Sequence, residues 1–332
     1  MKTLVNGVRP WRHDLAGCLH ACAATLLAQR GLDPLQVLGC GWVFRYAPGD
    51  FRREEYYFPT RPGESLFAAL TPHHRVASRW HDPADADAGW TEVRDMVAGG
   101  TPVAVAVDSF HLHFRPAYRD VHANHLIIVY GFDEATGTAR VLDAVPPQFD
   151  GDIPLADLRV ARGSANEGAH DRDMFFADQP IGHRWLELMT GERPATLDRV
   201  RVAQVLRRNR ETYADEGRGA LRVFLTEMER QLADGDSVAD ELFVVAGTAL
   251  SVTGLHAGWL ADAGRRLGAT RLMELGREVE CVAHHWTALR ILAALTRHGE
   301  VSAARLARRH RELRTAYDQA FARIDDWVEE PC

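Results

Sequence analysis

The sequence predicts an α+β fold for residues 1–182, followed by an all-α fold for residues 183–332. In the first region, apolar residues show helical spacing at 17–31. Aliphatic runs at 102–108 and within 125–143 indicate strands, which are fewer than the helices. After about residue 183 the apolar residues keep helical spacing, and strand alternation is absent. A chain of 332 residues is long enough for two such domains.

The first element is a helix that begins at a cysteine. Apolar side chains recur every three or four residues over 17–31, and Gly31 provides a C-terminal stop. Cys18 therefore lies in the first helical turn, where unpaired N–H groups and the positive end of the helix dipole favour a thiolate. Because the thiolate is the nucleophile of cysteine chemistry, Cys18 is a candidate nucleophile. Cys22 lies on the apolar stripe and is better explained as a core residue.

Two β-branched or aliphatic runs flank a turn containing glycine, which predicts a β-hairpin over 125–143. If Tyr130 pairs with Thr138, His125 and Asp143 lie directly opposite each other, with Cβ atoms roughly 5 Å apart. At that distance a carboxylate can hold one imidazole nitrogen and leave the other to face a thiol.

The order of these residues along the chain resembles that of papain-like enzymes: a thiol at a helix start, a histidine leading a strand, and an acid about one hairpin later. We therefore predict a catalytic triad of Cys18, His125 and Asp143. Each match alone is weak, because all three residue types also serve ordinary structural purposes at such positions. Their joint order, spacing and register favour catalysis.

The second region predicts a helical bundle. Helical stretches are separated by Gly or Asp-Gly breaks and lie near 195–213, 217–233, 237–265, 270–297 and 301–329. We expect this all-α domain, residues 183–332, to wall the substrate site together with the loop 109–124, because pockets commonly form between domains. Such a wall would also shield an acyl intermediate from water.

Composition excludes several classes of function. Hydrophobic residues make up 46% and charged residues 26% of the chain, as in ordinary globular proteins. The net charge of −7, without a Lys/Arg-rich run, argues against a nucleic-acid partner. Five cysteines form no CxxC pair, which favours a reducing compartment. The N-terminus lacks an apolar signal region and no long apolar run is present, so we expect a cytoplasmic protein without a membrane partner.

Four histidines cluster before and at the start of the hairpin: His111, His113, His122 and His125. His-x-His and His-x-x-His spacings can share a metal ion, which is the alternative interpretation of the cluster. No HExxH helix or CxxC pair accompanies them, so we expect no metal. Instead we expect His111, Tyr118 and His122 to belong to a substrate-binding loop over the active site.

An acyl-transfer site also needs donors for an oxyanion. The backbone N–H of Cys18 at the helix start supplies one of them. Papain-like enzymes usually add a side chain a few residues upstream, often Gln, and this chain has no Gln there. Arg12 and His13 occupy that stretch and are the candidate second donors.

These stretches resemble the acyltransferase family typified by butirosin biosynthesis protein H, in which a papain-like N-terminal domain precedes a helical domain. The matching stretches are 17–20, 108–112 with Tyr118 and His122, 125–133 and 141–143. The resemblance implies antibiotic-type secondary metabolism, with an acyl group passing from a carrier-protein thioester to a cysteine and then to an amine. Cys18 would be the nucleophile, His125 the general base and acid, and Asp143 the orienting carboxylate.

The same resemblance implies the partners, which are an acyl or peptidyl carrier protein and a small-molecule amine acceptor. It implies no cofactor, because the substrate arrives on the phosphopantetheine of the carrier. Other interpretations stay open. The acyl chain could be released or cyclised by an internal nucleophile. A papain-like hydrolase (peptidase, amidase or thioesterase) would use the same triad. A catalytically silent binding module would have an Asp143 that does not face His125.

Overall fold

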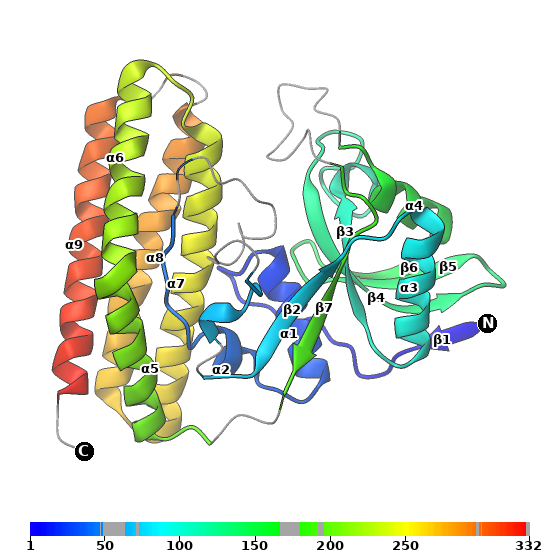
Figure 1. The fold of residues 1–332 in the computed structure, drawn as a ribbon, viewed down its shortest axis with the longest axis horizontal. Helices are drawn as coiled ribbons and strands as arrows, with labels where there is room; N and C mark the ends of the chain where they lie inside the picture. The colour runs from blue at the N-terminus through cyan, green and yellow to red at the C-terminus, as the bar shows by residue number, and fades with distance from the viewer. Residues whose placement is uncertain are drawn as a thin grey trace. The chain divides into compact units, whose positions relative to one another are not determined.

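The computed structural model describes residues 1–46, 48, 64–70, 73–166, 180–191, 196–296, 299 and 301–329. It confirms an α+β fold with an antiparallel sheet and a C-terminal helical region (Figure 1). The chain forms two compact units. The sheet unit comprises Met1–Asp14, Cys18–Pro34 and Ala77–Thr190, and the helical unit comprises Leu15–Gly17, Leu35–Val76 and Gly191–Cys332.

The described strands form one sheet in the order β2-β7-β3-β4-β5-β6, with β1 paired to β4. Their bounds are β1 Lys2–Leu4, β2 Val76–His81, β3 Val103–Asp108, β4 Asn124–Asp133, β5 Thr138–Asp143, β6 Phe149–Pro154 and β7 Trp185–Thr190. Every residue of β3 is buried, as its apolar run predicts. The adjacent strands β3 and β4 therefore lie at the centre of the sheet, and β4 carries His125.

Helices pack against these central strands. They are α1 Cys18–Gln29, α3 Ala86–Ala98 and α4 Leu155–Gly163. As predicted, α1 begins at Cys18 and stops before Gly31, whose positive φ of 76° lets the N–H of Leu32 reach back to the carbonyl of Leu27. The α1 helix packs on β3 and β4, which brings Cys18 to the strand that carries His125.

The hairpin of β4 and β5 forms as predicted, but its register is different. Ile128 pairs with Leu142, and a bulge between Val129 and Gly131 shifts the pairing toward the turn. Continuing this register puts Asp143 opposite position 127 rather than opposite His125. The prediction is thus off by two residues, and side chains two residues apart along a strand share a face. The carboxylate of Asp143 therefore still reaches the imidazole of His125, on a diagonal.

The prediction of an all-α region from residue 183 is wrong for the strand β7, which lies between β2 and β3 in the sheet. Trp185, Leu186 and Leu188 are buried there. Residues 35–76 in turn cluster with the helices, and Trp42 stacks on Phe321 with ring centroids 4.6 Å apart. The two units are therefore interleaved along the chain, where the sequence indicated one boundary after residue 182.

The described helices of the helical unit form a bundle (Figure 1). They are α2 Pro34–Leu38, α5 Arg199–Thr212, the π-helix η3 Tyr213–Gly217, α6 Arg218–Asp234, α7 Ala239–Leu267, α8 Thr270–Thr296 and α9 Ala303–Val328, and the unit also contains the short 3₁₀ turn η1 Ala68–Leu70. By length and composition, α7 could cross a membrane, but 67% of its most apolar window is buried. A core helix of a bundle has the same composition.

The expected break between the first two helical stretches is absent. Gly217 has ordinary helical angles, and α5, η3 and α6 form one continuous helix. A Cβ at position 217 would lie 2.9 Å from Cδ2 of Tyr213, so this glycine permits close packing and does not stop the helix. Gly235 and Gly268, by contrast, have positive φ values and end α6 and α7 as predicted.

Candidate active site

The thiol of Cys18 lies at the first residue of α1, as predicted, and is partly buried. The first N–H groups of a helix lack intrahelical acceptors, and the helix dipole places partial positive charge there. Both effects stabilise a thiolate at this position relative to a thiol elsewhere in the fold.

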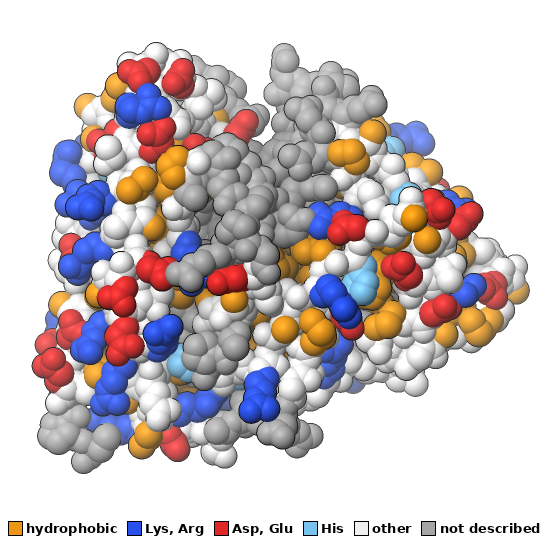
Figure 2. All heavy atoms as spheres, viewed as in Figure 1, with side chains coloured by type: hydrophobic (Ala, Val, Ile, Leu, Met, Phe, Trp, Pro, Cys, Tyr) orange, Lys and Arg blue, Asp and Glu red, His pale blue; other side chains and the backbone are white. Residues whose placement is uncertain are grey.

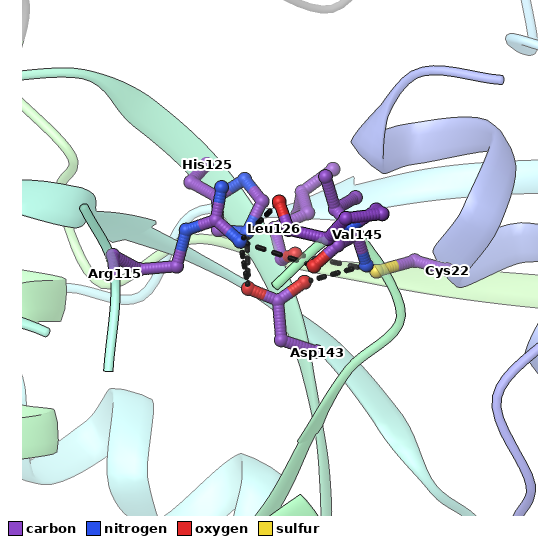
Figure 3. Close-up of polar contacts among 7 residues, drawn as sticks. Cys22, Arg115, His125, Leu126, Asp143 and Val145 are labelled. Carbon is purple, nitrogen blue, oxygen red and sulfur yellow. Dashed lines mark hydrogen bonds and ion pairs between the residues drawn. The ribbon is translucent and has the colours of Figure 1, made fainter. Parts of the chain in front are cut away.

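His125 and Asp143 meet beside this thiol. His125 is the second residue of β4 and Asp143 the last residue of β5, and both are buried. Nε2 of His125 lies 2.7 Å from Oδ2 of Asp143 (Figure 3). The short, buried contact fixes the orientation of the ring and leaves Nδ1 as its second nitrogen. An Asp143 that faces His125 contradicts what a silent binding module predicts.

The electrostatics of His125 are set by two opposing effects. Burial lowers the pKa of the imidazole, but the charge of Asp143, its hydrogen bond and the hydrogen-bonded thiol of Cys18 together raise that pKa to about 9. At neutral pH the imidazole therefore holds a proton. A protonated imidazole beside Cys18 stabilises negative charge on the sulfur, which is the state needed for nucleophilic attack.

Arg115 is a site residue that the sequence did not reveal. Its Nη1 lies 3.2 Å from Oδ2 of Asp143 and 3.1 Å from the carbonyl oxygen of Val145. The N–H of Val145 donates to the other carboxylate oxygen at 2.9 Å. Figure 3 shows the guanidinium and the imidazole converging on the same carboxylate. The loop 109–124 contains both Arg115 and Arg119 and has no periodic pattern. The sequence therefore did not indicate which of the two arginines contacts Asp143.

The neighbouring cysteine has a different environment. Cys22 is buried, and its Sγ contacts the carbonyl oxygen of Leu126 at 3.4 Å. Burial raises the pKa of this thiol well above its usual value, and the nearby charges of Cys18 and Asp143 raise it further. Cys22 is therefore a neutral packing residue one helical turn from the reactive position, as its place on the apolar stripe predicts.

The two candidate oxyanion donors lie in the segment before α1. The N–H of Trp11 donates to Oγ1 of Thr25 at 3.0 Å, which ties this segment to the helix. Arg12 is exposed and forms an ion pair with Asp14 at 3.0 Å. His13 is half-buried and lies close enough to His20, in the first turn of α1, for its charge to contribute to the lowered pKa of His20, after burial. Of the two, His13 is the one with an interaction at the start of α1.

The predicted substrate-binding loop is organised around a second carboxylate, Asp108. Nδ1 of His122 lies 2.6 Å and Nε2 of His111 lies 3.9 Å from Oδ2 of Asp108. Both imidazoles border a hollow of about 600 Å³ whose lining does not include Cys18, His125 or Asp143. Tyr118 is exposed, and the guanidinium of Arg119 stacks over its ring. Side chains of this loop therefore reach two different carboxylates. Arg115 contacts Asp143, whereas His122 and His111 lie beside Asp108.

A metal site was the alternative interpretation of the histidine cluster. Within the described part of the chain, no group of three or more His, Cys, Asp or Glu side chains is arranged to hold a metal ion. The imidazole of His122 is instead held by its hydrogen bond to Asp108 and by packing, since its ring stacks on Phe110 with centroids 4.1 Å apart.

Comparison with curated proteins finds no match to this chain. One family model does match: it covers residues 17–144 and is described as butirosin biosynthesis protein H, N-terminal. The matched stretch contains Cys18, Arg115, His125 and Asp143, whereas the candidate oxyanion donors Arg12 and His13 precede it. Over residues 17–144 the chain is therefore similar to the family that its motifs resemble.

Proposed function

We propose that this protein is a papain-like cysteine acyltransferase of natural-product biosynthesis. It moves an acyl group from the thioester of a carrier protein to Cys18, and from Cys18 to an amine acceptor. The observation that carries the proposal is the contact between His125 and the buried Asp143 beside a thiol at a helix start. That arrangement is the nucleophile, base and orienting acid of acyl transfer.

In the first half-reaction, the Cys18 thiolate, paired with the protonated imidazole of His125, attacks the thioester carbonyl. The backbone N–H of Cys18 donates to the oxyanion, with His13 as the candidate second donor. The bond to the carrier sulfur then breaks, and His125 donates its proton to that sulfur. The products are acyl-Cys18 and the free carrier thiol. Asp143 keeps the ring in one orientation throughout and stabilises the imidazolium.

In the second half-reaction, an amine attacks acyl-Cys18 and passes a proton to His125. The C–S bond breaks, an amide leaves, and the pair of thiolate and imidazolium is restored. Water in place of the amine would give a free acid by the same route, and an internal nucleophile would give a cyclic product. The three outcomes differ only in which nucleophile reaches the thioester, so the site residues alone do not distinguish them.

The family supports transfer over hydrolysis. Its description names a biosynthetic protein, and a biosynthetic reaction forms a bond where a hydrolase breaks one. We therefore include a carrier protein and an amine acceptor among the proposed partners, and antibiotic-type metabolism as the setting. The acyl group arrives already activated as a thioester, so the proposed reaction uses no cofactor of its own.

The test is to load Cys18 from acyl thioesters of a carrier protein or of a small thiol, and to measure the intact mass of the protein. We expect one acyl group per chain in the wild type and none in Cys18→Ala. Cys22→Ala is the matched control on the same helix, and it should load normally because Cys22 only packs. Decay of the loaded enzyme is then followed with and without a panel of amines.

Acceleration by an amine, with the matching amide in solution, would support the transferase. Decay to free acid that no amine diverts would replace it with the hydrolase. If Cys18 does not load from any thioester while the protein is folded, neither the acyltransferase nor a thioesterase stands.

A further inference from the structure

The helical unit contains a hollow of about 590 Å³, far along the chain from the family-matched residues. It is lined by residues from η3, from the start of α6 and from α9, and all of these lie in the helical unit. Ligand pockets commonly have volumes of this size. Neither the proposed acyl transfer nor the family assigns it a use.

The hollow is formed where the helix changes geometry. Over Tyr213–Gly217 the chain is a π-helix, and the N–H of Arg218 bonds to the carbonyl of Tyr213. Such wide turns are rare and occur frequently at functional sites. The ring of Tyr213 is held in place by stacking on Phe321, with centroids 4.0 Å apart. The aromatic stacking thus fixes the side chain of Tyr213 at the start of the π-helix.

Three guanidinium groups line this hollow, from Arg218, Arg222 and Arg314. Arg218 forms an ion pair with Asp318 at 3.5 Å, and it lies 5.5 Å from the ring centre of Tyr213. Within the described part of the chain, Arg222 and Arg314 make no ion pair or side-chain hydrogen bond. Figure 2 shows basic and acidic side chains interspersed over the outer helices, whereas here the arginines outnumber the two lining acids, Asp215 and Asp318.

We propose that this hollow binds the phosphate group of a small phosphorylated molecule. Arginine presents planar donors that match phosphate oxygens in pairs. Arg222 and Arg314 are exposed and form no ion pair with any described acid, so both can turn to one ligand. The positive excess is local, because the whole chain carries a net charge of −7. The lining has three arginines and two aspartates, so a bound phosphate would balance the one excess positive charge.

One further feature fits a bound ligand. Gly219 also lies in the lining. A Cβ at this position would meet nothing within 4 Å, so the glycine leaves open space where any other residue would project a side chain.

Gly219 also provides a sharp test. Gly219→Glu would add a carboxylate at the lining, at a position where a Cβ meets nothing within 4 Å, and Gly219→Gln is its uncharged match in size. Arg222→Gln and Arg314→Gln each remove one proposed ligand group. Arg207→Gln is a control, because Arg207 is an exposed arginine on α5 that does not line the hollow.

Binding is measured by isothermal titration with inorganic phosphate, with phosphopantetheine, and with sulfate as a competing anion. We expect wild-type binding to weaken about tenfold or more in Arg222→Gln, Arg314→Gln and Gly219→Glu, and to be unchanged in Arg207→Gln. If Gly219→Gln weakens phosphate binding less than Gly219→Glu does, the loss of affinity is due to the added negative charge.

The two phosphate probes distinguish the source of the group. Equal affinities indicate that free phosphate is enough, and tighter binding of the ester indicates a larger phosphorylated ligand. Absence of binding to either probe would overturn the proposal. So would an equal loss in all arginine variants, Arg207→Gln included, because that result indicates diffuse charge. Loading of Cys18 is a separate readout, so failure here leaves the proposed acyl transfer intact.

Discussion

Two buried aspartates in the sheet unit each hold an imidazole, and the two histidines are three residues apart in the chain. Nε2 of His125 lies 2.7 Å from Asp143, and Nδ1 of His122 lies 2.6 Å from Asp108. Both carboxylates are also bonded to a backbone N–H of the following chain, at Val145 and at Phe110. The two pairs are alike in distance and in the burial of the carboxylate, although the side chain of His122 is 14% exposed and that of His125 only 7%.

Their remaining contacts separate them. The carboxylate of Asp143 also accepts from Arg115, and its imidazole meets the Cys18 thiol. The carboxylate of Asp108 accepts from the Ser164 hydroxyl and from the N–H of Ala123. Ser164 donates to the acid and not to the imidazole, which is the wrong connection for a nucleophile. A histidine held by an aspartate is thus a common structural device, and the group on the second nitrogen decides whether it can do chemistry.

The largest expected difference between the pairs is in the rate of acylation. Asp143→Asn should slow loading of Cys18 by roughly two to four orders of magnitude, because the ring loses its orienting charge. Asp108→Asn should leave the rate near that of the wild type and lower the free energy of unfolding by about 1–3 kcal/mol, as charge-assisted hydrogen bonds are lost. Loading rates by mass spectrometry and denaturant titration check both. Similar loading rates in Asp143→Asn and Asp108→Asn would contradict a catalytic role that is specific to Asp143.

The second prediction concerns the thiols. Iodoacetamide at pH 6 should label Cys18 about 100-fold faster than the exposed Cys281, since the thiolate fraction of an ordinary cysteine falls about tenfold per pH unit. Cys22 and Cys40 should stay unlabelled in the folded protein, because both are buried, and burial raises the pKa of Cys40 to about 12. Peptide mapping over time measures this. Parallel loss of Cys18 and Cys281 labelling with falling pH would show an ordinary thiol at position 18.

The third prediction concerns stability and pH. The folded protein holds the pKa of His125 at about 9, above the usual 6.5, so this group stabilises the fold fully below pH 6.5 and loses that contribution as pH rises through 9. The contribution is up to about 3 kcal/mol. Urea titrations between pH 6 and 10 should show the loss in the wild type and in Asp108→Asn, and a flatter profile in His125→Gln. A wild-type slope retained in His125→Gln would place the effect elsewhere.

The smallest effect should come from Arg115, which acts on Asp143 and not on the substrate. Arg115→Met should lower the maximal loading rate about tenfold, with little change in the thioester concentration that gives half of that rate. The reason is that Asp143, which orients His125, loses its contact with the guanidinium. Arg119→Met on the same loop is the control, because Arg119 contacts the exposed Tyr118 ring. A change confined to substrate affinity would mean that Arg115 binds substrate instead.

Local patterns predicted much of the fold. The helical spacing from Cys18 to Gly31 placed the thiol at the start of α1, and the two aliphatic runs placed His125 and Asp143 on paired strands. The exact register was missed, because the bulge at Tyr130 depends on packing that has no sequence period. The pair still meets because an error of two residues keeps both side chains on one face of the sheet. The substrate-binding and oxyanion roles of Arg12, His13, His111, Tyr118 and His122 stay predictions.

The sequence by itself determined the elements and their periodic faces, because helical and strand spacing are encoded within a few neighbouring residues. Only the tertiary structure decided which loop residues reach which carboxylate. Arg115 and His122 lie in the same loop, yet one meets Asp143 and the other Asp108. Tertiary packing also decided that Gly217 continues a helix while Gly235 ends one. Such choices depend on contacts between residues far apart in the chain, and no local pattern carries that information.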